Sequence, residues 1–168
     1  TVAISHARPM NEVMGAGSNA DAHHITAPAP GGKGAIACMH LALDEAGLAP
    51  ADIACIPAAA GGPKGLALIP RDKLLFREWL QPAPGPVELI GASIGAWRMA
   101  ALAQPDPLAA LDRLQHGYVH DQCYTEKPTP REVAATCRRI AQAVLGGRPL
   151  EVRERVSLTI VTARARGP

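Results

Sequence analysis

Apolar residues follow a helical spacing in the region just after residue 32. Between residues 33 and 46 they recur every three or four positions, at Ile36, Met39 and Leu43, which is typical of a helix with one buried face. Gly47 comes directly after this pattern, where a glycine commonly ends a helix, and Pro50 lies beyond it. The pattern therefore predicts a helix over residues 33–46.

The rest of the chain alternates between short extended runs and amphipathic stretches. Apolar and β-branched runs predict strands over 12–16, 52–57, 87–90 and 156–162, the last as a central strand. Helical spacing predicts helices over 66–80, 94–103, 107–116 and 130–145. Pro70 is expected to kink or interrupt the first turns of the helix over 66–80. Residues 17–32 are expected to be mainly irregular, and residues 81–86, with three prolines, predict a linker.

Two of these helices carry start signals in the sequence. Asp106 is a good N-cap, and the proline that follows it suits the first helical position. Thr129 and Glu132 have the spacing of a capping box, again with a proline after the cap. The glycine pair at 146–147 is expected to end the second of these helices.

The order of the predicted elements indicates the fold class. Strands alternate with helices, which is the order of βαβ units and predicts an α/β fold, a parallel sheet with flanking helices on both faces. The 168 residues are enough for one domain with a core. Aromatic residues make up only 3% of the chain, so Ala, Leu, Ile and Val must build that core, and we expect modest stability. No internal repeat is visible.

Charge and hydropathy exclude several classes of function. The net charge is +2 and the basic residues are scattered, so we expect no nucleic-acid partner. No stretch reaches the roughly 18 apolar residues of a membrane span, and no signal segment opens the chain. We therefore expect a cytoplasmic protein, with peripheral membrane association as the alternative. The chain begins at Thr1 rather than Met, which leaves room for a leader segment.

The cysteines and histidines predict no metal centre and no cofactor. The four cysteines lack C-x-x-C spacing, and we interpret them as free, buried thiols in a reducing compartment rather than zinc ligands. His23 and His24 are adjacent, so in a strand they would point to opposite faces. No third ligand accompanies them at a suitable spacing, and we interpret them as a loop contact.

Ser93 is a candidate for a chemical role. The predicted strand over 87–90 runs into Gly91-Ala92-Ser93-Ile94-Gly95 and then directly into a helix. Gly91 and Gly95 allow strand and helix to approach at a sharp turn that leaves the serine hydroxyl exposed, as in a nucleophile elbow. The alternative is that Ser93 is a small residue that only permits a tight turn.

A second glycine-rich segment lies roughly 30 residues upstream. The glycine loop (residues 60–65, Ala-Gly-Gly-Pro-Lys-Gly) follows another predicted strand. We expect the backbone amides around Gly61, Gly62, Lys64 and Gly65 to form an oxyanion hole, while Lys64 adds positive potential. Pro63 has no N–H, so the donors must come from its neighbours.

Residues 53–168 resemble the patatin-like phospholipase family. The glycine loop is similar to that family's G-G-G-x-K/R-G, with Ala60 in place of the first glycine, and Ser93 matches the family nucleophile. The WRM sequence at 97–99 and the segment 106–112 resemble a bacterial branch of the family. The resemblance implies an incomplete patatin-like core and a serine hydrolase whose substrate is a lipid or another acyl ester.

The base that such a serine requires is missing from the matching pattern. The family uses a Ser–Asp dyad whose aspartate lies in a later D-G-A/G motif, and this sequence contains no Asp-Gly dipeptide. We expect the chain to stop before the place where the family has its base, which leaves the serine a weak nucleophile. His116 and His120 share a helical face and are alternative bases, although such a face is commonly solvated.

Residues 7–54 are similar to a different family, the β-ketoacyl-ACP synthases, in the C-terminal half of synthase II. The similarity lies in the segments 12–17 and 21–28 and in the helix through 42–48. That family continues into N-A-H-G-T-S-T, whose histidine takes part in condensation, whereas residues 58–62 are Ala-Ala-Ala-Gly-Gly. We therefore expect no condensation activity.

Two resemblances in one chain predict a chimera. We divide the chain into a ketosynthase-like segment, residues 1–52, and a truncated patatin-like domain, residues 53–168, with the switch inside residues 43–56. The leading hypothesis is a serine acyl-ester hydrolase scaffold. The second is an inactive truncated or chimeric product that acts through association of an exposed sheet edge. The third is a ketosynthase fragment without its catalytic residues.

Overall fold

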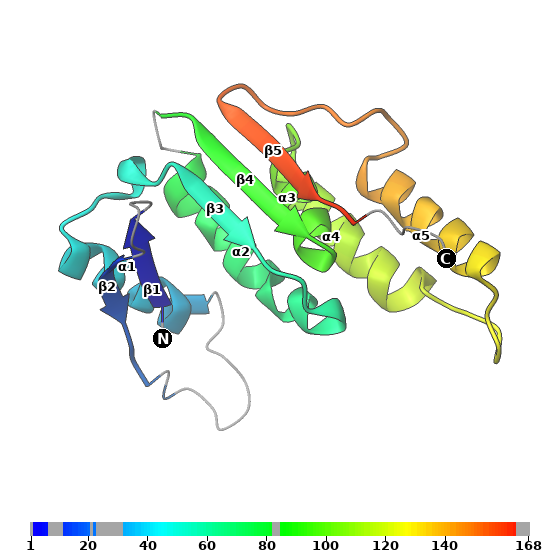
Figure 1. Ribbon diagram of the computed structural model, residues 1–168, viewed down its shortest axis with the longest axis horizontal. Helices are drawn as coiled ribbons and strands as arrows, with labels where there is room; N and C mark the ends of the chain where they lie inside the picture. Colours follow the sequence, from blue (N-terminus) through cyan, green and yellow to red (C-terminus); the bar gives the residue numbers. More distant parts are fainter. Residues whose placement is uncertain (1, 7–11, 21, 23–31, 82–84, 164–168) are drawn as a thin grey trace. The chain divides into compact units, whose positions relative to one another are not determined.

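The computed structural model describes residues 2–6, 12–20, 22, 32–81 and 85–163, and the chain divides into two compact units (Figure 1). The N-terminal unit comprises Thr1–Ile53 and Leu74–Gly85, and the sheet unit comprises Ala54–Lys73 and Pro86–Pro168. Each unit has its own β-sheet.

The N-terminal unit is built on a two-stranded antiparallel sheet and one long helix. Strand β1 (Val2–His6) pairs with β2 (Glu12–Gly17), and helix α1 (Lys33–Ala46) packs against β2. The predictions of a strand over 12–16 and of a helix over 33–46 are confirmed. Gly47 ends α1 with φ 66°, and its N–H donates to the carbonyl oxygen of Asp44. Strand β1 was not predicted.

Strand β2 lies flat against α1 because glycines face the helix. A Cβ atom on Gly17 would lie 1.8 Å from the carbonyl oxygen of Cys38, and one on Gly15 would lie 2.2 Å from that of Ala42. Helix α1 in turn buries Cys38, Met39, Ala42 and Leu43. The predicted irregular stretch 17–32 and the linker 81–86 lie largely outside the described residues.

The helix predicted over 66–80 is three consecutive helices of different geometry. The 3₁₀ helix η3 (Gly62–Leu68) leads into α2 (Ile69–Leu75), and a π-helical segment η4 (Phe76–Leu80) follows. Pro70 is the second residue of α2, in the first turn of the α-helix, where proline is tolerated. The expected interruption at Pro70 is therefore a change from 3₁₀ to α geometry at Ile69. A further 3₁₀ turn, η2 (Pro50–Asp52), precedes the next strand.

The sheet unit contains a three-stranded parallel sheet in the order β3-β4-β5. The strands are β3 (Cys55–Ala58), β4 (Val87–Ala92) and β5 (Val156–Val161). Pairing runs in register from Cys55 with Glu88 to Ala58 with Gly91, and from Val87 with Val156 to Ala92 with Val161. The predicted α/β class and parallel sheet are confirmed.

The central strand is β4, whereas the sequence analysis placed the strand over 156–162 in the centre. Within the part of the chain that the structure describes, β5 has β4 on one side and no strand on the other. Its β-branched composition is typical of a buried parallel strand, yet Ile160 and Val161 are 47% and 56% exposed. The correction follows from pairing partners, which composition does not encode.

Helices flank this sheet. Helix α3 (Ile94–Leu102) packs against all three strands and lies behind the sheet in Figure 1, while α4 (Pro107–His116) packs on α3 and α5 (Pro130–Val144) on α4. Burial alternates along β4, where Val87 and Leu89 are buried and Glu88 and Ile90 are half-buried. The described helices of this unit therefore cover one face of the sheet more completely than the other, whereas helices were expected on both faces.

The predicted helix starts are confirmed in atomic detail. The Asp106 carboxylate accepts from the Ala109 N–H at 3.1 Å, and the Thr129 hydroxyl accepts from the Glu132 N–H at 3.2 Å. After α5, Gly146 and Gly147 have φ values of 64° and 71°. Helix α4 continues into a π-helical segment η5 (Gly117–Asp121), which was not predicted.

Aliphatic side chains dominate the core of the sheet unit, as the composition predicts. Fully buried positions include Leu89, Met99, Leu102, Leu111 and Leu114. Among the described residues, no helix is both long enough and apolar enough to cross a membrane.

Candidate active site at the end of β4

Ser93 joins β4 to α3 in a strained conformation. Its φ of 52° and ψ of −127° lie in a region that L-residues rarely adopt, at a cost of about 1–3 kcal/mol. The residue is exposed, and its side chain makes no capping hydrogen bond to α3. The hydroxyl is thus presented at the N-terminal end of a helix, where unpaired backbone N–H groups and the helix dipole favour negative charge.

The two glycines around Ser93 are required by close backbone contacts. A Cβ atom on Gly91 would lie 2.4 Å from the Cα of Ala96, so no side chain fits between β4 and the first turn of α3. A Cβ atom on Gly95 would lie 2.2 Å from the carbonyl oxygen of Ala58, at the end of β3. The turn can therefore be this sharp only with glycine at both positions.

The glycine loop lies beside this turn. Gly65 is buried, and a Cβ atom there would lie 2.6 Å from Cγ2 of Ile94, the residue after Ser93. Gly62 begins η3 with φ 55°, while Gly61 has extended backbone with φ −178°. Gly61 and Lys64 are exposed. The structure thus brings together the two segments that the sequence analysis singled out separately.

A cavity of about 400 Å³ lies against the glycine loop. Its lining combines the loop and the end of β3 with three side chains from the helices, Leu68, Arg71 and Arg98. Lys64 also contributes, so the lining is rich in positive charge, whereas Ser93 is not part of it.

A buried ion pair beside this cavity was not predicted from the sequence. Arg98 on α3 is 1% exposed and Asp72 on α2 is 0% exposed. The Nε and Nη2 atoms of Arg98 donate to the two carboxylate oxygens of Asp72 at 2.5 and 2.7 Å. Arg71 approaches the same carboxylate at 3.4 Å. The available signal was a single arginine inside an otherwise apolar helix, because a charge in such a position needs a partner.

The two histidines predicted as alternative bases lie next to each other, and several aspartates hold partners of their own. His116 and His120 are exposed, with ring centroids 4.8 Å apart. Four described aspartates hold a backbone N–H or a cationic partner, namely Asp52, Asp72, Asp106 and Asp112. None of these six residues lines the cavity beside the glycine loop.

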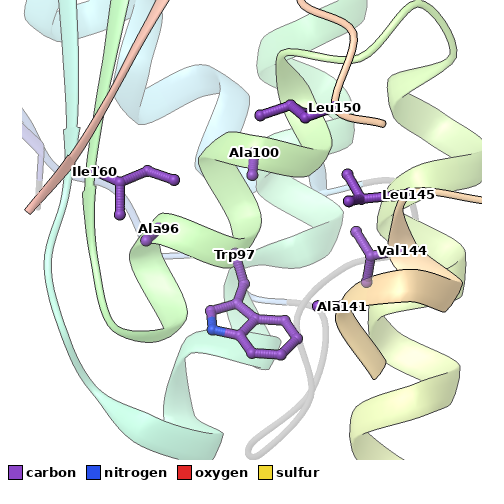
Figure 2. Close-up of a pocket in the computed structure, with 8 residues that line it drawn as sticks. All are labelled: Ala96, Trp97, Ala100, Ala141, Val144, Leu145, Leu150 and Ile160. Atoms are coloured by element: carbon purple, nitrogen blue, oxygen red, sulfur yellow. The ribbon is translucent and has the colours of Figure 1, made fainter. Parts of the chain in front are cut away.

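An apolar hollow lies along the same helix that Ser93 begins. Figure 2 shows its lining. Ala96, Trp97 and Ala100 of α3 face the C-terminal end of α5. Ala141 and Val144 belong to α5, and Leu145 is its C-cap. Leu150, which follows α5, and Ile160 of β5 complete the lining. The volume is about 240 Å³, and Leu150 and Ile160 remain 39% and 47% exposed. The hollow therefore offers partly open apolar surface close to the start of α3.

The cysteines differ from the expectation of buried thiols. All four are free, but Cys55 and Cys123 are exposed, Cys137 is half-buried and Cys38 is buried. The expectation was wrong for the exposed pair because Cys55 occupies the less covered face of the sheet and Cys123 follows η5. The described residues contain no cluster of three metal-binding side chains. His23 and His24 lie outside the described residues.

Comparison with known proteins gives a finding for the N-terminal part of the chain. Residues 10–65 match the family described as Beta-ketoacyl synthase, C-terminal domain. The 3-oxoacyl-[acyl-carrier-protein] synthase 2 of Staphylococcus aureus is 50% identical over 42 residues, which cover 25% of this chain and 10% of that protein. The enzyme of the same name from Rhizobium meliloti (strain 1021) is 47% identical over 55 residues, which cover 30% of this chain and 13% of that protein.

The matched part of the chain therefore spans about a tenth of the length of these relatives. No solved structure matches the chain. The N-terminal segment is β-ketoacyl synthase-like, and the family match extends past the predicted switch at 43–56 to the end of the glycine loop.

Proposed function

We propose that residues 53–168 are the scaffold of a patatin-like serine hydrolase that acts on an acyl ester, with Ser93 as the nucleophile. The observation that carries this proposal is the strained, exposed conformation of Ser93 between β4 and α3. Strain of this kind persists where the surrounding structure imposes it and is concentrated at functional sites. A serine that served only as a small turn residue would be replaced by glycine at no steric cost.

The glycine loop supports the proposal as the source of the oxyanion hole. In the proposed reaction the Oγ of Ser93 attacks the ester carbonyl carbon, and the carbonyl oxygen takes the negative charge. Backbone N–H groups of Gly61, Gly62, Lys64 and Gly65 would donate to this oxygen. One such preorganised donor contributes about 3–4 kcal/mol to the transition state in related chemistry. Collapse of the intermediate expels the alcohol and leaves an acyl group on Ser93, which water then removes.

The apolar hollow along α3 supports an acyl substrate. Ala96, Trp97 and Ala100 follow Ser93 on the same helix and form one wall of the hollow. An acyl chain whose carbonyl lies at Ser93 would have apolar surface within one or two helical turns. We therefore propose a substrate with a short or partly buried acyl chain.

The general base is the part of this proposal that the sequence does not match. The sequence has no Asp-Gly dipeptide, and Asp72, Asp106 and Asp112 are held in other contacts. Turnover therefore requires a base other than these residues. Labelling by an activated phosphonate needs a general base less than turnover does. The reagent reacts once, its fluoride leaves readily, and the hydroxyl proton passes to water.

Labelling of the full chain by a fluorophosphonate tests the proposal. The expected product is a single adduct on Ser93 in which the phosphorus has lost fluoride, and its rate should rise with pH as the unassisted hydroxyl ionises. Ser157→Ala, a change at an exposed serine of β5, should label like the wild type. Labelling of Ser93→Ala at the wild-type rate would contradict the proposal.

A second candidate function follows from the match over residues 10–65. We propose that this segment is a ketosynthase fragment without condensation activity, because Ala58-Ala59-Ala60-Gly61-Gly62 replaces the histidine-bearing motif. The purified chain should release no carbon dioxide from malonyl-ACP. Release above a protein-free control would show that the fragment retains catalysis.

A further inference from the structure

The glycine loop is supported by few packed side chains. Residues Ala58–Gly61 of the lining face a cavity of about 400 Å³, and Gly61 and Lys64 are exposed. Close approaches to the Ser93 turn include that of Gly65 to Ile94 and, at the end of β3, that of Ala58 to Gly95. A loop that borders a cavity depends on the elements at its ends for its position, because empty space provides no restoring contacts.

The glycine loop runs into η3, which leads directly into α2, and α2 is tied to the Ser93 helix. Asp72 lies four residues into α2, and Arg98 lies five residues after Ser93 on α3. The guanidinium binds the carboxylate with two parallel hydrogen bonds of 2.5 and 2.7 Å. Such a bidentate pair specifies distance and orientation, which a single point charge does not.

Burial makes this pair a poor source of stability. Asp72 and Arg98 are 0% and 1% exposed, so both groups lose their hydration, and apolar replacements of such pairs are often neutral or stabilising. The chain also has an exposed pair between α2 and α4, Lys73 with Asp112, which holds α2 without reaching α3. The role that remains for the buried pair is to fix α2 against α3.

We propose that Arg98, held by Asp72, is a positioning residue that sets the distance between the glycine loop and Ser93. An effect of the pair on the reactivity of Ser93 depends on the proposed function. The restraint that the pair places on the backbone of residues 61–65 does not depend on it. Neither residue touches the reacting atoms.

The test is the paired variant Asp72→Leu/Arg98→Met, which leaves no unpaired buried charge. Hydrogen exchange of the amides of Gly61, Gly62, Lys64 and Gly65 is measured in the full chain. We expect exchange to be about tenfold faster than in the wild type while the thermal midpoint is retained. The matched control, Lys73→Met/Asp112→Leu, should leave exchange in the loop unchanged.

Fluorophosphonate labelling is measured on the same proteins. We expect labelling of Ser93 to slow by about 10- to 100-fold in Asp72→Leu/Arg98→Met, because small displacements of catalytic groups cost that much, and to be unchanged in the control. Arg98→Lys retains the charge but loses the bidentate geometry. It should give an intermediate effect, and it provides the measurement if the paired variant does not fold.

The outcomes separate the two proposals. Unchanged exchange in the loop overturns the positioning role whether or not Ser93 reacts, and so does faster exchange with unchanged labelling. Faster exchange in a chain whose wild-type Ser93 does not label supports the restraint on the loop and refutes the hydrolase proposal.

Discussion

Ser93 combines a strained backbone conformation with a proposed chemical role. Its positive φ occurs at the junction of β4 with α3, where backbone atoms approach Gly91 and Gly95 too closely for any side chain at those positions. Serine tolerates this conformation only at a cost in free energy. Glycine adopts this conformation without that cost, so the free energy of the strain at position 93 can be measured by substitution.

We predict that Ser93→Gly is more stable than Ser93→Ala by about 1 kcal/mol in free energy of unfolding. Both variants remove the hydroxyl, but only glycine relieves the strain, and this gain exceeds the extra entropy that glycine gives the unfolded chain. Urea unfolding of the two variants measures the difference. Equal stabilities would mean that the turn is not strained at Ser93.

Cys55 offers a second residue whose chemistry follows from its neighbours. Partial burial raises the pKa of the Cys55 thiol, and the nearby Glu88 carboxylate raises that pKa further. Glu88 also accepts a hydrogen bond from the Thr159 hydroxyl at 2.9 Å, which a glutamine at that position can retain.

Glu88→Gln is therefore expected to speed alkylation of Cys55 by iodoacetamide about two- to threefold near pH 8, because a lower pKa yields more thiolate. Exposed Cys123 provides the internal control, and its rate should not change. Mass spectrometry of the modified peptides measures both rates. An unchanged rate at Cys55 would contradict the influence of Glu88.

Among the elements, the long helices were predicted well and the region around Pro70 was not. Helix α1 has the predicted bounds, because its apolar spacing, glycine stop and following proline all act locally. The stretch 66–80 changes from 3₁₀ to α to π geometry. Those changes accompany contacts with residues distant in sequence, such as the edge contact of Trp79 with His40 at 6.1 Å.

The start of α5 makes an element-level prediction about pH. The pKa of Glu132 is lowered because its carboxylate accepts hydrogen bonds from the backbone N–H and then from the hydroxyl of Thr125, both at 2.8 Å. A carboxyl whose pKa is lowered by folding stabilises the folded state above its unfolded pKa. This stability is lost as pH falls through the folded pKa.

Acidification from about pH 6 to about pH 3 should therefore destabilise the wild type more than Glu132→Gln. Urea midpoints at the two pH values test this, and an NMR titration of the Glu132 carboxyl tests the cause. A Glu132 pKa at the ordinary glutamate value would refute it. Thr125→Val, which removes only the hydroxyl donor, should raise the Glu132 pKa part of the way.

At the scale of the whole molecule, the three-stranded sheet has open edges at both outer strands, β3 and β5, in the part of the chain that the structure describes. Strand β5 has a partner only in β4, and Val161 at its end is 56% exposed. An unpaired strand edge is a template for another strand. This supports the proposal that the chain self-associates, most simply by pairing β5 with its copy about a two-fold axis.

Size-exclusion chromatography over a range of concentrations tests self-association. The wild type is expected to elute as a dimer or larger, and Val161→Lys should move it toward the monomer because a charge blunts a strand edge. Val119→Lys, at a 58% exposed position in η5, should have no effect. A wild type that is monomeric throughout would remove the association hypothesis.

Local patterns were sufficient for the class of fold, the caps of α4 and α5, and the turn that holds Ser93. Each of these depends on residues within a few positions of one another, so their physics is contained in short segments. The candidate site could be located for the same reason, since the glycine loop and the elbow are both local motifs.

Long-range contacts were needed for the rest. The pairing that puts β4 rather than β5 in the centre, the approach of Gly65 to Ile94, and the buried bond between Asp72 and Arg98 all join distant segments. The sequence lists the residues that can make such contacts, but their partners follow from packing a three-dimensional core. Composition and periodicity contain no information about that choice.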